Sequence, residues 1–196
     1  MQARERIATT KPMQPGLEER RAFEYKRHGT LSLIANFDVV SGQVVASNLG
    51  PRRTEADFVA HIAQTIETDP QAVWLFVTDQ LNTHQSESLV RLVAEHCAIR
   101  DALGQKVKSG VLQSVSSRAA FLSDPAHRIQ FVYVPKHMSW LNQIEIWFSI
   151  LVRRVIKRGN FPSVAALCER IRAFIAYFNQ TAKPFKWTYT GQPLTM

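Results

Sequence analysis

The stretch AVWLFVTD, residues 72 to 79, decides the fold class expected for this chain. Its apolar run shows no alternation of polar and apolar residues, which is typical of a strand covered on both faces inside an α/β sheet. The run ends at Asp79, and open α/β sheets place their chemistry at strand ends. The sequence therefore predicts a buried strand that carries an acidic residue at the edge where a site would form.

Sequence patterns before and after that strand predict further strands and helices, which together would form a layered fold. Outward from it, the residue spacing predicts a β-hairpin around Ser41-Gly42, a second strand at 129–135, and helices at 54–68, 86–98, 139–158 and 163–179. Thr54 and Asp57 have the spacing of a capping box at the start of the first helix. This order of elements predicts a mixed sheet flanked by helices.

Length and composition limit the class of protein. The chain has 196 residues and is 45% apolar, which suits one domain with a single core. No apolar run approaches the roughly 20 residues of a membrane span, and the first residues show no secretory pattern. Cys97 and Cys168 are far apart and indicate packing in a reduced cytoplasm, not a disulfide framework or a zinc site.

The distribution of charged residues along the chain separates a slightly acidic centre from basic ends. The net charge is +8, yet residues 31 to 149 hold nine lysines and arginines against eleven acids, and residues 150 to 196 hold eight against one. Basic ends around a slightly acidic centre suit an enzyme that binds a phosphate backbone. Solvated basic helices that only keep the protein in solution would give the same distribution of charge. The candidate DNA-binding residues are Arg52, Arg53, Arg153, Arg154, Lys157 and Arg158.

We divide the chain accordingly into three parts. Residues 1–29 are charge-dense and lack a strand or helix pattern, which predicts a basic N-terminal arm. Residues 30–179 form the expected core, with an insertion at about 100–117. Residues 180–196 form a basic tail.

A second unusual acid lies in a helix crowded with large apolar side chains. Asn142, Glu145 and Ser149 share one face of that helix, distinct from its apolar stripe. A glutamate in such surroundings must reach water or find a cation, because burying an unpaired carboxylate costs several kcal/mol. Asp79 and Glu145 together would offer the oxygen ligands that Mg²⁺ or Mn²⁺ prefers, and two such ions can activate phosphodiester chemistry.

Each of these residues also has a purely structural interpretation. Asp79 could be a loop or helix-capping acid, and Glu145 could simply face solvent. His84 could contact DNA or the metal, or could bond within its loop. Trp140 and Trp147 have aromatic side chains that could stack on nucleic-acid bases, but tryptophan at helical spacing more often lies in a core.

Two strings resemble a known family of enzymes. DQLNTH, residues 79 to 84, and SWLNQIEIWFSILVRR, residues 139 to 154, resemble the DDE transposases of the IS630 and Tc1/mariner superfamily. The likeness continues into PGLEERRAFEYKRHGT near the start and PFKWTYTG near the end, so it spans nearly the whole chain.

The resemblance implies a ribonuclease H-like fold and metal-dependent DNA cleavage and strand transfer. Asp79 then matches the second catalytic carboxylate and Glu145 the third, both binding Mg²⁺ or Mn²⁺, with Asn142 and His84 in supporting positions. The implied partners are transposon ends and target DNA, and a homodimer is expected on paired ends. The expected location is the cytoplasm, associated with the nucleoid.

The chain departs from the family pattern in two ways. The family's first carboxylate lies on the first strand, yet residues 1 to 29 contain no aspartate, so that strand is expected to be missing. In addition, 65 residues separate Asp79 from Glu145, a longer interval than usual, which the insertion at about 100–117 explains. Asp38 is expected to stabilise a turn instead of replacing the first carboxylate. The alternative is therefore a catalytically inactive DNA-binding remnant of a transposase.

Overall fold

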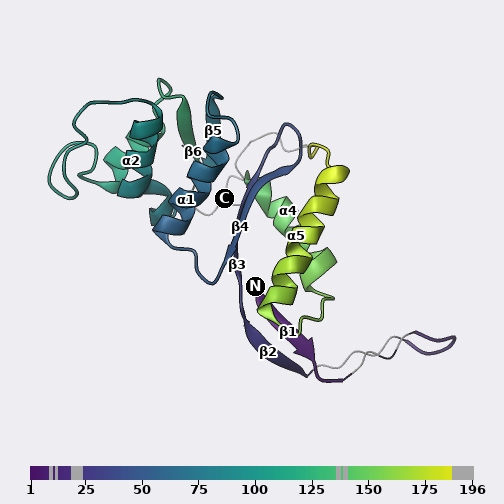
Figure 1. Ribbon diagram of the computed structural model, residues 1–196. Coiled ribbons are helices and arrows are strands. Elements are labelled where there is room, and N and C mark those ends of the chain that lie inside the picture. Colours follow the sequence, from purple (N-terminus) through teal and green to yellow (C-terminus); the bar gives the residue numbers. More distant parts are fainter. Residues whose placement is uncertain (9–10, 12, 19–23, 136–137, 139–140, 187–196) are drawn as a thin grey trace, which may run out of the picture.

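The computed structural model describes residues 1–8, 11, 13–18, 24–135, 138 and 141–186 (Figure 1). Its strands are β1 (Gln2–Arg6), β2 (Tyr25–Thr30), β3 (Ser32–Phe37), β4 (Val44–Gly50), β5 (Trp74–Thr78) and β6 (Ile129–Tyr133). Its helices are α1 (Glu55–Glu67), α2 (Glu87–His96), α3 (Val115–Leu122), α4 (Ile144–Leu151) and α5 (Val164–Gln180). Two shorter helical segments are the 3₁₀ turn η1 (Asn82–Gln85) and the π-helical turn η3 (Val152–Ile156).

Most elements expected from sequence patterns are present. The hairpin β3–β4 and the helices α1, α2 and α5 begin and end within a few residues of their expected bounds. The capping box of α1 is formed, because the Thr54 hydroxyl accepts from Asp57 N and the Asp57 carboxylate accepts from Thr54 N. Asp38 stabilises the hairpin turn, as expected: its carboxylate accepts from Val40 N and from the Ser41 hydroxyl.

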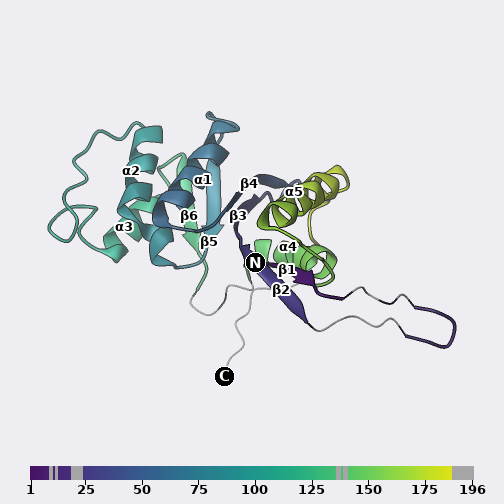
Figure 2. The same cartoon turned by 60° about the horizontal axis from the view of Figure 1, so that its bottom comes forward.

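The N-terminal region is not an arm throughout. Gln2–Arg6 and Tyr25–Thr30 form an antiparallel pair, β1–β2, where we expected no strand. Charged residues obscured the pattern, because Arg4, Glu5, Lys26 and Arg27 lie on a ladder that is largely exposed to water. Residues 13–18, which come between the two strands in the sequence, lie away from the rest of the described chain (Figures 1 and 2).

Two further helical details differ from expectation. Helix α3 occupies Val115–Leu122, so the expected insertion overlaps its first turn and its capping serine, Ser114. The long helix expected at 139–158 begins at Ile144 in the described chain and changes at Val152 into the π-helical turn η3. There the Lys157 N–H donates to the Val152 carbonyl at 2.8 Å, five residues back.

The described strands form three separate two-stranded ladders instead of the single mixed sheet that we expected. Strands β1 and β2 pair, as do β3 and β4, both antiparallel, and β5 pairs with β6 in parallel. The overall class remains mixed α/β, with helices packed against small sheets. The sheet is interrupted because β3 and β5 do not pair with each other.

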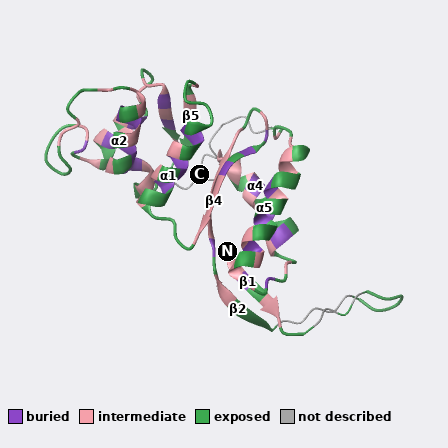
Figure 3. Ribbon diagram, viewed as in Figure 1, coloured by how far each residue is buried: buried purple, intermediate pink, exposed green. Residues whose placement is uncertain are grey.

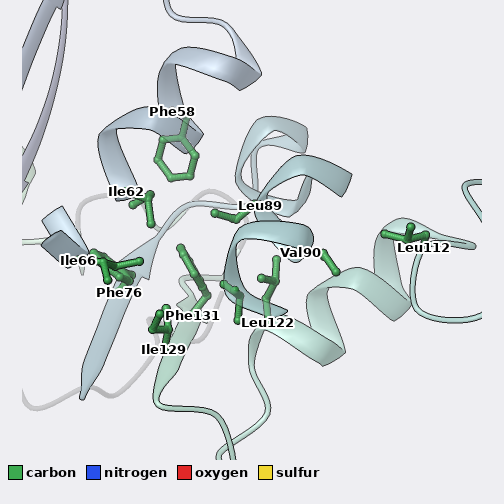
Figure 4. Packing of buried hydrophobic residues seen from close by; sticks show 11 residues of the cluster. Phe58, Ile62, Ile66, Phe76, Leu89, Val90, Leu112, Leu122, Ile129 and Phe131 are labelled. Carbon is green, nitrogen blue, oxygen red and sulfur yellow. The ribbon is translucent and has the colours of Figure 1, made fainter. Parts of the chain in front are cut away.

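Two hydrophobic cores hold these ladders in place. The first core joins β5, β6 and the helices α1 to α3, and Figure 4 shows Phe58, Ile62, Phe76 and Phe131 converging within it. The second core packs α4, η3 and α5 against β1, β3 and β4 around Trp147. Strand β3 lies between the two, since Ile34 packs against the first core whereas Leu33, Ala35 and Phe37 pack against the second.

Strand β5 is covered on one face only, so the expectation of a strand buried on both faces was wrong. Phe76 is buried among the helices, but Leu75 and Val77 are 59% and 44% exposed. Val132 on the neighbouring β6 is also exposed. The continuous apolar run therefore reflects a face that no described element covers.

Two smaller expectations concern cysteines and membrane spans. Cys97 packs against the first core and Cys168 against the second, and both are free thiols, as the packing interpretation predicted. Within the described ranges, no helix has the length and hydropathy needed to cross a bilayer.

Candidate functional site

Asp79 directly follows β5, at the carboxyl end of the strand. The His84 Nδ1–H donates to the Asp79 backbone carbonyl at 3.2 Å. One carboxylate oxygen of Asp79 lies 2.6 Å from the same nitrogen, at ion-pair distance. The same oxygen also accepts from the Leu81 N–H at 3.3 Å. The His84 ring contacts the Phe58 ring of α1 in a tilted arrangement, with ring centroids 4.1 Å apart. Asp79 is thus held in a compact loop yet is 41% exposed, so its carboxylate also reaches solvent.

Three side chains hold that loop: the half-buried Tyr133, the buried Arg118, and the exposed Gln80 of the loop itself. The Tyr133 hydroxyl donates to the His84 carbonyl at 2.9 Å. Arg118 is buried and donates from Nε to the Gln85 carbonyl at 2.7 Å. Gln80 Nε2 donates to the Val134 carbonyl. The sequence patterns did not single out these positioning residues, because tyrosine and arginine carry no motif that marks a contact across 30 or more residues.

Tyr133 offers a direct measure of how strongly the loop is held. Burial raises the pKa of its hydroxyl, which therefore stays protonated and donates. Tyr133→Phe should lower the free energy of unfolding by about 1 kcal/mol, because the buried bond is lost and the His84 carbonyl loses its partner. Urea unfolding measures the loss, and amide exchange at Leu81 should quicken. Equal stability and unchanged exchange would show that the hydroxyl does not hold the loop.

Glu145 lies in the first turn of α4 and is exposed to solvent. The sequence left two possibilities for this acid, contact with water or contact with a cation, and in the structure its side chain contacts water. A carboxylate at this position also interacts favourably with the positive end of the helix dipole. The apolar neighbours that made it conspicuous turn the other way, since Trp147 and Leu151 are buried in the second core.

Asn142 connects the start of α4 to β5. Its Oδ1 accepts from the Ile144 N–H at 3.3 Å, at the beginning of the helix. Its Nδ2 donates to the Val77 carbonyl at 3.2 Å. Val77 is two residues before Asp79, and Asn142 is three residues before Glu145. One side chain therefore joins the two elements that carry the candidate carboxylates, across 65 positions of sequence.

The described residues fit a divalent metal ion only in part. Asp79 and Glu145 supply hard oxygen donors, the type that Mg²⁺ and Mn²⁺ prefer. However, no group of three or more His, Cys, Asp or Glu side chains is placed to hold an ion among the residues described. One carboxylate oxygen of Asp79 is also in contact with His84 Nδ1. Two carboxylate donors do not by themselves complete the coordination of such an ion.

The expected DNA-binding cations are all accessible. Arg52 and Arg53 are exposed in the loop that leads into α1. Phe58, one turn into that helix, contacts the His84 ring, so this loop approaches the same end of the first core as Asp79. Arg153, Arg154, Lys157 and Arg158 are exposed along η3 and its end, on the helical continuation of the segment that carries Glu145.

The two candidate base-stacking tryptophans have different outcomes. Trp147 is fully buried and contacts the rings of Phe148, Phe174 and Phe178, which confirms the core interpretation. Trp140 lies outside the described residues.

Comparison with protein families gives one match that spans most of the chain. The model of the DDE superfamily endonuclease family matches residues 2–168. No curated protein and no solved structure matches the chain. The match covers α1, β5 with Asp79, α4 with Glu145 and Asn142, and the start of α5. The chain therefore belongs to the DDE superfamily endonuclease family.

Proposed function

We propose that the chain is part of the catalytic domain of an IS630 or Tc1/mariner type transposase, which cleaves DNA strands and joins them to a target. The observation that carries the proposal is the hydrogen bond from Asn142 to Val77, because it brings the start of α4 to the end of β5. Asp79 and Glu145 extend from these two places and act as the second and third carboxylates of the site. DNA cleavage by a DDE endonuclease agrees with the family match.

Asp79 and Glu145 would hold Mg²⁺ or Mn²⁺. When bound, such ions activate a water or a 3′-hydroxyl group and stabilise the negative charge that develops on phosphorus. His84 orients Asp79 through its 2.6 Å contact, and Tyr133 in turn holds the His84 backbone. Asn142 sets the direction in which α4 leaves β5.

The open edges of β3 and β5 support a ribonuclease H-like sheet with one strand missing. Leu31 exchanges both backbone hydrogen bonds with Met1, and Asp38 N donates to Gln43 on the β4 side. Because alternate residues of a strand face opposite edges, Leu33 and Ala35 turn their backbone groups away from β4. A strand that continued the β1 ladder past Met1 would pair with this edge, antiparallel to β3.

Strand β5 is open in the same sense, except that its Val77 carbonyl accepts from Asn142 Nδ2. Trp74 N and the Thr78 carbonyl bond to the β6 side, so Leu75 and Val77 direct their backbone groups to the opposite edge. The side chains of these two residues are also exposed. We propose that one further strand lies between β3 and β5 and that it brings the first carboxylate beside Asp79.

Exposed basic side chains complete the proposed function. Arg52, Arg53, Arg153, Arg154, Lys157 and Arg158 contact DNA phosphates and supply salt-dependent affinity. Action as a homodimer on paired transposon ends, in the nucleoid, agrees with this interpretation and remains an expectation from the family resemblance.

Manganese binding tests the pairing of the two carboxylates. Bound Mn²⁺ should broaden the amide NMR signals of Leu81 and Ile144 together, because one ion would lie near both. Asp79→Asn and Glu145→Gln should each weaken Mn²⁺ binding by tenfold or more, since each removes a charged ligand. Glu169→Gln, at an exposed position of α5, is the matched control and should leave the affinity unchanged. Broadening at only one of the two amides would contradict a shared ion.

Strand cleavage distinguishes the proposal from its alternative. Nicking of supercoiled plasmid in Mg²⁺ by the chain supplied with the proposed further strand, with loss in both carboxylate variants, supports the transposase interpretation. DNA binding without Mn²⁺ binding or nicking supports the inactive remnant instead. The observation that favours this alternative is the absence of a three-donor group from the residues described.

A further inference from the structure

A groove lies between the end of α4 with η3 and the C-terminal half of α5, on the second core. Its volume is about 480 Å³, a size that suits a nucleotide and exceeds the needs of a single ion. The polar and aromatic lining comes from Arg153, Arg154, Phe174, Tyr177, Phe178 and Thr181. The two helices pack side by side in both views of the fold (Figures 1 and 2).

The π-helical turn η3 places both arginines at this groove. Arg153 and Arg154 are adjacent in sequence, both are exposed, and both line it. The guanidinium group is planar and binds phosphate through paired N–H donors. The surrounding chain reinforces this preference, since residues 150 to 196 hold eight lysines and arginines against a single acid, Glu169. A phosphate-bearing ligand is therefore favoured over a neutral or cationic one.

Tyr177 gives the groove an open aromatic surface. Its side chain is 61% exposed, although Phe174 and Phe178 on the same helix are half-buried. Figure 3 shows both exposed and buried positions along α5, and its buried residues Leu167, Ile171 and Ile175 belong to the second core. An exposed ring beside paired arginines matches single-stranded nucleic acid, in which bases are free to stack while phosphates follow basic side chains.

We propose that this groove binds single-stranded DNA, with a base stacked on Tyr177 and the adjoining phosphates held by Arg153 and Arg154. The inference rests on the proposed function, because strand cleavage and transfer produce free DNA ends that need to be held. Duplex DNA presents its phosphates to the same arginines but keeps its bases stacked on one another. Tyr177 therefore confers a preference for single strands, which the arginines alone would not.

Binding of a labelled 12-nucleotide oligothymidine, followed by fluorescence anisotropy in EDTA, tests this assignment. Tyr177→Ala should weaken binding about tenfold, the usual effect of losing one stacked base. Tyr177→Phe keeps the ring and should bind within twofold of wild type. R153Q/R154Q should lower the slope of log affinity against log salt by about 1.4, because two phosphate contacts are lost from a single strand. Tyr177→Ala should leave that slope unchanged.

Matched controls separate the groove from the general charge of the surface. Tyr25→Ala removes another exposed tyrosine that an arginine covers, on β2, and R170Q/R172Q removes two exposed arginines of α5 outside the groove. Both should bind like wild type at physiological salt. The proposal would be overturned if Tyr177→Ala weakened the binding of duplex and single-stranded DNA equally. It would also be overturned if this variant bound oligothymidine with the affinity of wild type. Tyr177→Leu, which keeps bulk without a π face, replaces the alanine variant if the latter unfolds.

These outcomes are independent of the catalytic proposal. No metal is present in the assay, and Asp79→Asn and Glu145→Gln should bind oligothymidine at least as well as wild type. Failure of Mn²⁺ binding would leave the groove result standing, and failure of the groove would leave the metal result standing.

Discussion

Replacing Trp147 by alanine should lower the free energy of unfolding by about 3–5 kcal/mol, the range for removing a large aromatic side chain from a packed core. Trp147 is fully buried in the second core and contacts three phenylalanine rings across α4 and α5. Aromatic pairs of this kind contribute beyond the area that they bury. The alanine side chain would make none of these ring contacts and would leave a cavity in the core.

Urea unfolding of wild type, Trp147→Ala and Trp147→Phe measures the effect. The phenylalanine variant should lose less than half as much, because it keeps a ring and removes an indole N–H that is buried without a partner among the described residues. Trp147→Ala should also weaken Mn²⁺ binding, since Glu145 lies two residues earlier on the helix that Trp147 anchors. A loss below about 1 kcal/mol would show that this core does not hold α4.

Lowering the pH from 8 to 5 should destabilise the wild-type chain by about 2 kcal/mol through His61 alone. His61 is fully buried on α1, and within the described part of the chain neither ring nitrogen has a hydrogen-bond partner. Burial lowers its pKa to about 4, from 6.5 in the unfolded chain. Between these values the unfolded state binds the extra proton, so stability is present above pH 6.5 and is lost as the pH falls toward 4.

His61→Leu removes this dependence. The variant and wild type should differ little at pH 8, where the imidazole is neutral in both states, and the variant should be more stable by about 2 kcal/mol at pH 5. Denaturant unfolding at several pH values, with the two curves subtracted, isolates the contribution of this histidine. Curves that stay parallel from pH 8 to 5 would show that His61 is already protonated or solvated in the fold.

Helices were the elements that the sequence predicted best. Phe58, Ile62 and Ile66 recur at four-residue spacing and face the first core in α1, and Thr54 with Asp57 forms the expected capping box. These features depend on residues three or four positions apart, so local spacing is enough to reveal them. The charged strands β1 and β2 were not predicted. Neither face of this pair is buried along its length, so polar and apolar residues do not alternate in its sequence.

The candidate site was predicted in part. Asp79 at the end of a strand and Asn142 near the start of a helix follow from the two strings DQLNTH and SWLNQIEIWF. The contacts that hold them were not predictable, since Tyr133, Arg118 and Val77 meet the site from distant parts of the chain. The groove at Tyr177 was missed for the same reason, because it needs η3 and α5 to pack together.

Local patterns thus determined the family, the order of helices and strands, and the two carboxylates on which the proposed chemistry depends. The tertiary structure alone decided that β3 and β5 do not pair with each other, that one face of β5 is open, and that Asn142 joins α4 to β5. The physical reason is range: helix periodicity and caps act within one or two turns, whereas strand pairing and side-chain to backbone bonds across 65 positions depend on how the two cores pack.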